Sequence, residues 1–177
     1  DAAQDTKGKA TLVNVSAKNT TKLSSGNGGA AIGATAAGGG AAVTVNSIVK
    51  NTQAFMGKNV IVYNNRTKDN KLSITANNNE DIYSFVLQGS GGLYAGLAGA
   101  VDVNDLTVTT KAFTDTGAIL IAGSVAVDAV HELALTGTVI GASGGVGAIG
   151  AAVDVANINT QTNAFLGDSN SVNVSDD

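Results

Sequence analysis

The sequence predicts an all-β protein, a parallel β-helix of about six coils, and three observations lead to this prediction. The apolar residues are mostly small, and the 177 residues include 23 Gly but no Pro, Cys or Trp. Apolar pairs such as Val-x-Val recur along the chain every 24 to 30 residues, and Phe residues recur with them in one register. Such spacing is typical of a solenoid whose coils stack on one another.

The small size of the apolar residues restricts the kind of core that the chain can build. Hydrophobic residues make up an ordinary 44% of the chain, yet only four Phe and three Tyr are present. Ala, Val, Ile and Gly reach the packing density of a protein interior only where backbones approach closely. Thin, coiled β-structures achieve that close approach, and the segments between the apolar pairs show turn residues and no helical periodicity.

A long repeat is the clearest internal pattern. Three segments begin at Val43, Val101 and Val153, and in each of them a Phe follows twelve residues later. The first residues of these segments lie 58 and then 52 residues apart. We therefore predict one solenoid domain over residues 1–177, with repeat units at about 13–71, 72–124 and 125–177.

Each long unit contains two apolar pairs, and we interpret each half-unit as one coil of three short strands separated by turns. The Gly-rich stretches are expected to form tight corners or a flat, closely packed face. Alternation along Val153-Asp154-Val155 predicts that the two Val side chains point inward and the Asp outward. The same reasoning predicts that Phe55, Phe113 and Phe165 form an internal aromatic row. Asn46 and Asn104 are expected in an Asn ladder at a bend.

The charge composition excludes two classes of partner. The net charge is −4 and the sequence pI is about 4.7, which argues against nucleic acid, because phosphate contacts need clustered Lys and Arg. Three uncharged stretches of roughly 20 residues could reach across a bilayer as helices. They are rich in Gly, Ser and Thr and lack basic flanks, so we expect no membrane insertion of this segment.

No group of residues predicts catalysis. His131 is the only His and is expected on an exposed strand position, without the partners of a triad or a zinc site. Asp102 and Asp154 are expected on a solvated face, about 10 Å apart if two coils separate them. Gly145–Gly150 matches a dinucleotide-binding spacing, but a strand pattern follows it where a helix is required. We predict no catalytic residue, no cofactor, no metal and no enzyme activity.

One insertion breaks the repeat. The first unit carries nine residues, Tyr63 to Lys71, where the second unit has only Ala122-Gly123-Ser124. Departures from a regular solenoid often protrude on one face and bind there. The insertion is therefore a candidate contact loop, and its candidate contact residues are Tyr63, Arg66, Lys68, Asp69 and Lys71.

The repeat resembles that of a known class of proteins. A Gly-rich run, then Ala-Val-x-Val-Asn-x-Ile, then Ala-Phe and Gly is similar to repeats of giant bacterial type V secreted exoproteins, including filamentous-haemagglutinin-like proteins, autotransporter adhesins and fusobacterial leukotoxin-like proteins. Val43–Gly57 and Val153–Gly167 carry the resemblance best, and the second unit departs from it at Thr114-Asp115. The resemblance implies a right-handed parallel β-helix exported to the cell surface, and it implies no catalytic residues.

From this resemblance we expect a stretch of a longer exoprotein, secreted or held at the bacterial surface. Its expected role is structural and adhesive, with a host cell-surface or matrix protein or glycan as its partner and further coils of the parent chain beside it. Two alternatives remain open at this point. The rod could belong to a secreted toxin that acts on host cells, or it could be a carbohydrate-active β-helix enzyme, which would need clustered charged residues and aromatic platforms that the sequence lacks.

Overall fold

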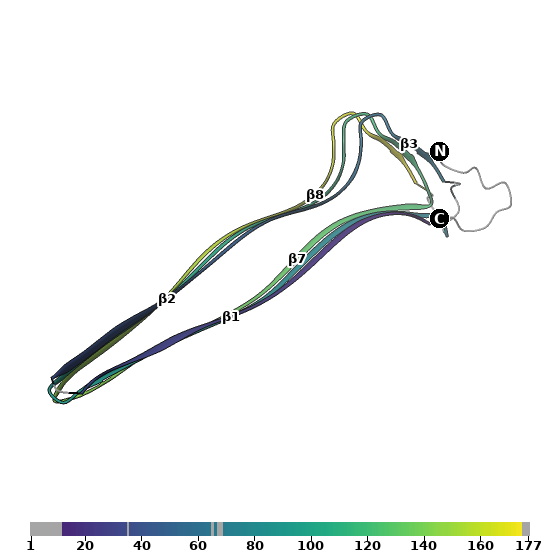
Figure 1. Ribbon diagram of the computed structural model, residues 1–177. Coiled ribbons are helices and arrows are strands. Elements are labelled where there is room, and N and C mark those ends of the chain that lie inside the picture. The colour runs from purple at the N-terminus through teal and green to yellow at the C-terminus, as the bar shows by residue number, and fades with distance from the viewer. Residues whose placement is uncertain (1–11, 35, 65, 67–68, 175–177) are drawn as a thin grey trace.

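The computed structural model describes residues 12–34, 36–64, 66 and 69–174. Within them the chain is all-β and forms a parallel β-helix, in which two long ribbons of strands converge at one end (Figure 1). The strands are β1 (Val13–Gly33), β2 (Ala37–Met56), β3 (Ile61–Tyr63), β4 (Lys71–Gly92), β5 (Ala95–Thr114), β6 (Ile119–Ile121), β7 (Ser124–Gly144), β8 (Gly147–Leu166) and β9 (Ser171–Asn173).

The strands form three parallel sheets, ordered β1-β4-β7, β2-β5-β8 and β3-β6-β9. Each coil therefore consists of two long strands and one short strand, and the described residues make three coils. The register places equivalent repeat residues side by side, with Val43 next to Val101 and Val101 next to Val153. The long period read from the sequence is thus the length of one coil.

The prediction of about six coils of three short strands is wrong. Each half-unit is one long strand with its turn, so that successive apolar pairs lie alternately on the two long sheets. The Gly-rich runs were expected to give tight corners or a flat, closely packed face, and both occur: Gly38–Gly40 lies inside β2, whereas turns at the tapered end follow Gly92 and Gly144. Strands of 20 to 22 residues extend for about 70 Å, so the long axis of the molecule follows the strands and not the stack of coils.

Glycine is needed where the two long sheets converge. A Cβ atom added at Gly150 in β8 would lie 2.6 Å from the backbone oxygen of Gly141 in β7, which is closer than side chains allow. The Gly-rich and Ala-rich runs are therefore extended strands that let opposite backbones approach, and the molecule tapers toward this end (Figure 1).

At the opposite end, one corner shape recurs in every coil. Asn59, Gly117 and Ser169 occupy the same position between the second long strand and the short strand, and all three have positive φ, of 55°, 77° and 58°. Gly57 and Gly167 precede this position in the first and third coils, whereas the second coil has Asp115 there and places its glycine at 117. The departure from the repeat at Thr114-Asp115 leaves the corner unchanged.

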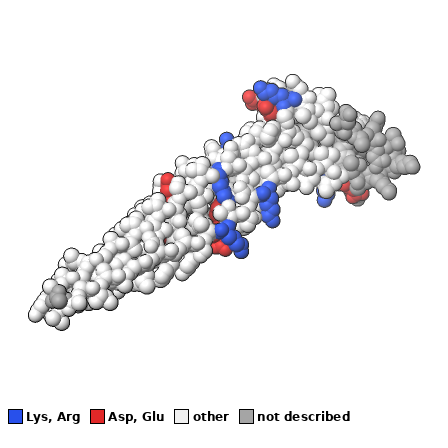
Figure 2. Space-filling model, in the orientation of Figure 1, with Lys and Arg blue, Asp and Glu red and all other residues white. Residues whose placement is uncertain are grey.

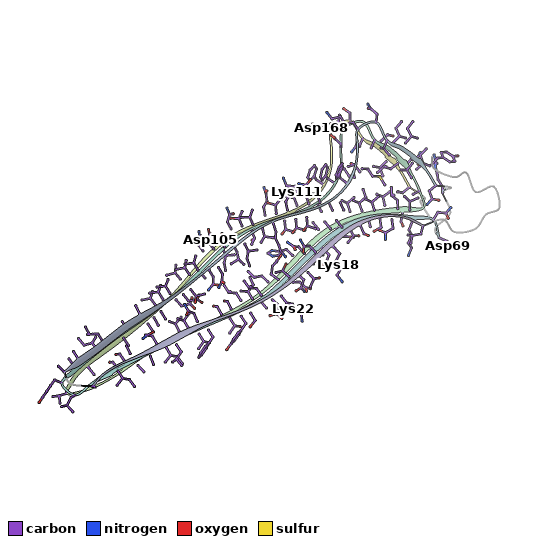
Figure 3. The ribbon with its side chains drawn as sticks, viewed as in Figure 1. Lys18, Lys22, Asp69, Asp105, Lys111 and Asp168 are labelled. Carbon is purple, nitrogen blue, oxygen red and sulfur yellow. The ribbon has the colours of Figure 1, made fainter. Side chains whose placement is uncertain are left out.

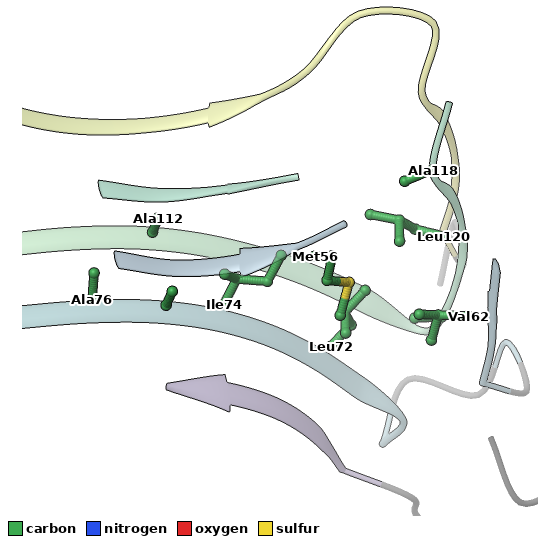
Figure 4. Close-up of a cluster of buried hydrophobic side chains, with 10 residues drawn as sticks. Met56, Val62, Leu72, Ile74, Ala76, Ala112, Ala118 and Leu120 are labelled. Atoms are coloured by element: carbon green, nitrogen blue, oxygen red, sulfur yellow. The ribbon is translucent and has the colours of Figure 1, made fainter. Parts of the chain in front are cut away.

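The apolar core lies at the broad end, where the third sheet holds the two long sheets apart (Figure 4). Met56, Leu72, Ile74 and Leu120 are its largest buried side chains, and Ala residues fill the space between them. A second, smaller cluster of Ala42, Val86 and Ala100 lies nearer the tapered end. Buried polar side chains separate the two clusters.

The inward and outward faces of β2, β5 and β8 are opposite to those predicted. Val43 and Val45 are exposed, whereas the intervening ladder position of the second coil, Asp102, is fully buried. A two-residue period shows which residues share a face but does not say which face is inside. On β1, β4 and β7 the apolar residues do point inward, as at Leu72 and Ile74.

The aromatic row is confirmed as a stack but lies outside and not inside. Rings of Phe55 and Phe113 lie 5.2 Å apart, and those of Phe113 and Phe165 lie 5.1 Å apart, nearly parallel in both pairs. Phe55 is 52% exposed. The predicted Asn ladder is present, with Asn46 donating to Asn104 over 2.8 Å, but it lies within the strands and not at a bend.

The stack predicts unequal effects of removing its rings. Phe113→Ala should lower the free energy of unfolding by about 1–3 kcal/mol, because this ring stacks on two neighbours, each worth about 0.5–1.5 kcal/mol. Phe165→Ala should cost about half as much. Urea unfolding followed by circular dichroism measures both, with Tyr83→Ala on the opposite sheet as the control. Equal losses in the two Phe variants would contradict a stabilising stack.

Candidate interaction surfaces

The insertion predicted as a contact loop connects β3 to β4 at the broad end. Its ends are tied to the second coil, because the Asn64 amide donates to the Ile121 carbonyl over 2.7 Å and the Gly123 amide donates to the Asn70 carbonyl over 2.8 Å. Asn64 and Asn70 are buried, whereas the predicted contact residues Tyr63, Arg66, Asp69 and Lys71 are exposed. Lys68 lies outside the described residues.

A second surface was not singled out by the sequence analysis, because its residues were expected inside. We name it the Phe–Val face, which is the outer surface of the β2-β5-β8 sheet. Its apolar members are Val43, Val45, Phe55, Val101, Val103, Phe113, Val153, Val155 and Phe165. Polar residues, including Asn51, Thr109 and Gln161, separate the Val rows from the Phe stack in consecutive coils. Because the rings cover one another's faces, a partner would meet mainly their edges.

The opposite outer surface, that of β1-β4-β7, carries a shallow polar groove. Lys18 and Lys22 project from β1 beside Asp81 of β4 and Glu132 of β7, and Figure 3 shows both Lys side chains on this ribbon. Lys22 lies 4.0 Å from Asp81, and Asn79 donates to Glu132 over 2.8 Å. The alternation Lys18-x-Thr20-x-Lys22 would have indicated one shared face, but no sequence signal placed Glu132 beside it.

Charge is distributed unevenly along the molecule. In Figure 2 the Lys, Arg, Asp and Glu side chains gather over the middle and the broad end, and the tapered end shows none on the visible face. The sequence explains this distribution, because residues 23–49, 82–101 and 133–153 contain no charged side chain. Exposed apolar residues such as Ile32, Leu93 and Val146 lie near the tapered turns.

His131 is not the exposed residue that the sequence predicted. Its side chain points inward from β7 and is only 8% exposed, with Nε2 2.5 Å from Glu80 Oε2. Glu80 is fully buried, and Lys50 of β2 donates to its other oxygen over 3.2 Å and to Asn19 over 3.3 Å. Strands β2, β4 and β7 thus contribute to one buried ionic cluster, Lys50–Glu80–His131, that sequence spacing did not reveal.

Asp102 and Asp154 are neighbours in the β5–β8 register and are not separated by two coils; Asp154 is exposed, as predicted, but Asp102 is not. Asp102 is fully buried, and its Oδ2 accepts hydrogen bonds from Ser84 and, over 2.9 Å, from Asn104. Its Oδ1 has no hydrogen-bond partner. Gly137 is the third-coil counterpart of Ser84, and a Cβ there would overlap the Asp154 carboxylate.

These clusters do not assemble a recognisable catalytic arrangement. Across the part of the chain that the structure describes, no three His, Asp or Glu side chains lie close enough together to hold a metal ion. The Gly145–Gly150 run forms a turn with Gly145 at φ 141° and then enters β8, so no helix follows it. The same described residues contain no helix long and apolar enough to cross a bilayer.

Comparison with known proteins leaves the structure to carry the functional interpretation. No protein-family model, curated protein or solved structure matches the chain.

The buried ionic cluster predicts a large stability effect from one carboxylate. Glu80→Ala should lower the free energy of unfolding by about 3–5 kcal/mol, because Lys50 would keep a largely buried ammonium without its counter-charge. Lys22→Ala, which breaks only the exposed 4.0 Å pair with Asp81, should cost no more than about 1 kcal/mol. Denaturant titration compares the two. A loss in Glu80→Ala as small as that in Lys22→Ala would show that the cluster is not held by this carboxylate.

Proposed function

We propose that this chain is a structural and adhesive segment of a secreted or surface-displayed bacterial exoprotein. Its partner would be a host cell-surface or matrix component, either protein or glycan. The observation that carries the proposal is the Phe–Val face, where outward-facing apolar side chains repeat in register over all three coils, exposed in the first and third and half-buried in the second. Contiguous exposed apolar residues bordered by polar ones are a feature of interaction surfaces.

The scaffold supports this proposal in a second way. The backbone of each long strand is held by its neighbour over 20 or more residues, so the outer face is extended and regular. An extended face offers many weak contacts along its length, which suits attachment better than chemistry at one point. The loop between β3 and β4 adds exposed charged residues at the broad end, and we retain it as a second candidate contact.

Binding of the chain to host cells, matrix proteins and a glycan array tests the proposal. Val45→Asp and Val155→Asp, both at exposed positions, place negative charge on the Phe–Val face. Together they should weaken binding by about tenfold or more, because charged residues are depleted in the centre of interfaces. The paired substitutions Lys18→Ala and Lys22→Ala on the opposite sheet are the control.

The loop is tested in the same assay with Arg66→Ala and Asp69→Ala. Weakened binding in the face variant alone would assign attachment to the Phe–Val face, and weakened binding in both would include the loop. If the unmodified chain binds none of these surfaces, or if the face variant binds as the control does, the proposal is wrong.

A further inference from the structure

The buried ionic cluster also contains the groups of a covalent reaction that the chain can carry out on itself. Lys50 Nζ lies 3.3 Å from the side-chain carbonyl oxygen of Asn19 and 3.2 Å from Glu80 Oε1. The Lys50 side chain is only 10% exposed, and that of Glu80 is fully buried. An amine, a carboxamide and a carboxylate therefore meet at one point, away from bulk water.

Four strands hold these groups in contact. Asn19 lies on β1 and Lys50 on β2, the opposite long strand of the same coil, whereas Glu80 lies on β4 of the next coil. His131 of β7 contacts the other carboxylate oxygen, Oε2, over 2.5 Å, which leaves Oε1 to Lys50. Reacting groups that a fold holds in contact react far faster than the same groups free in solution.

The contact selects Asn19 among the neighbouring amides. Asn78 is the register partner of Asn19 and is fully buried, but among the described residues its side-chain oxygen and nitrogen have no hydrogen-bond partner. Asn51 follows Lys50 in the chain, but it is exposed and accepts a hydrogen bond from Gln53 over 2.8 Å. Asn19 is thus the amide whose carbonyl group meets the Lys50 amine.

We propose that Lys50 and Asn19 form an intramolecular isopeptide bond that joins β1 to β2. Glu80 takes a proton from the Lys50 ammonium, and the lone pair of the neutral amine then forms a bond to Cγ of Asn19. Glu80 passes its proton to Nδ2 of Asn19 and takes another from the attacking nitrogen. The Cγ–Nδ2 bond breaks and ammonia leaves.

The reaction needs no cofactor and no co-reactant. It happens once in each chain and turns over no external substrate, so it is separate from any enzyme activity. Burial favours its product, because an ammonium and a carboxylate that are costly to hold away from water give way to a neutral amide and a neutral acid. The bond links residues 31 positions apart and ties the two long sheets together. This inference does not depend on the proposed adhesive function.

The mass of the intact folded chain tests the proposal. Release of ammonia should lower it by about 17 Da relative to the mass of the sequence. In a tryptic digest, peptide 19–22 should remain joined to peptide 23–58, in which trypsin no longer cleaves after Lys50. The joined peptide identifies both residues of the bond.

Three variants separate the roles of the residues. Glu80→Gln keeps the size of the side chain but cannot carry the proton, so this variant should retain the mass of its sequence. Asn19→Asp should lose water in place of ammonia, about 18 Da, because the same attack falls on a carboxyl group. Lys22→Ala, at an exposed position on the same strand as Asn19, should lose ammonia as the unmodified chain does and is the control.

Mass spectrometry of each variant is combined with circular dichroism, which shows that the variant is folded. Loss of ammonia with the joined peptide in the unmodified chain, and its absence in Glu80→Gln, would support the proposal. An unmodified chain with the full mass of its sequence would overturn it. A loss of ammonia that maps to any residue other than Lys50 and Asn19, or a Glu80→Gln variant that reacts as the control does, would also overturn it.

Discussion

The in-register pairing of parallel strands is the constraint on which the rest of this structure depends. It places equivalent residues of successive coils side by side, so that a side chain repeated at equivalent positions packs against an identical side chain. Apolar, aromatic and amide residues gain from this arrangement, as the Phe stack and the Asn46–Asn104 hydrogen bond show. Inward-facing charged residues would repel identical neighbours. Glu80 avoids this repulsion, because its register neighbours are Thr21 and Leu133. Asp102 beside Asp154 is an exception to that pattern.

The interior changes character along the strands because the separation of the sheets changes. At the broad end the third sheet makes room for Leu, Ile and Met, whereas at the tapered end the backbones approach until only Gly and Ala fit. Between these ends the interior is wide enough for long polar side chains, some of which hydrogen-bond across the sheets, while Asn78 has no side-chain hydrogen-bond partner. Lys50, Glu80 and His131 come from three strands and meet there. A buried ionic cluster therefore occupies the middle of a molecule that is otherwise sparsely charged.

The outer surfaces of the two long sheets also differ in character. One long sheet carries valine and phenylalanine outward, and the other carries lysine, asparagine and acidic residues. The proposed attachment uses the first of these surfaces.

The all-β class, the parallel stacking and the column of three Phe residues were determined by the sequence alone, because a fixed repeat spacing brings equivalent residues together wherever the coil turns. Which face lies inside was decided only by the tertiary structure. Alternation in Val153-Asp154-Val155 is symmetrical between the two faces. The Asp side faces the interior, where Ser84 of the opposing sheet and Asn104 of the same strand donate to Asp102, the register neighbour of Asp154. The number of coils was also decided only by the tertiary structure. A glycine run in the sequence is compatible with a corner or with a closely packed strand, and each choice gives a different number of coils. The Lys50–Glu80–His131 cluster joins three strands that lie far apart in sequence, so only the fold could bring it together.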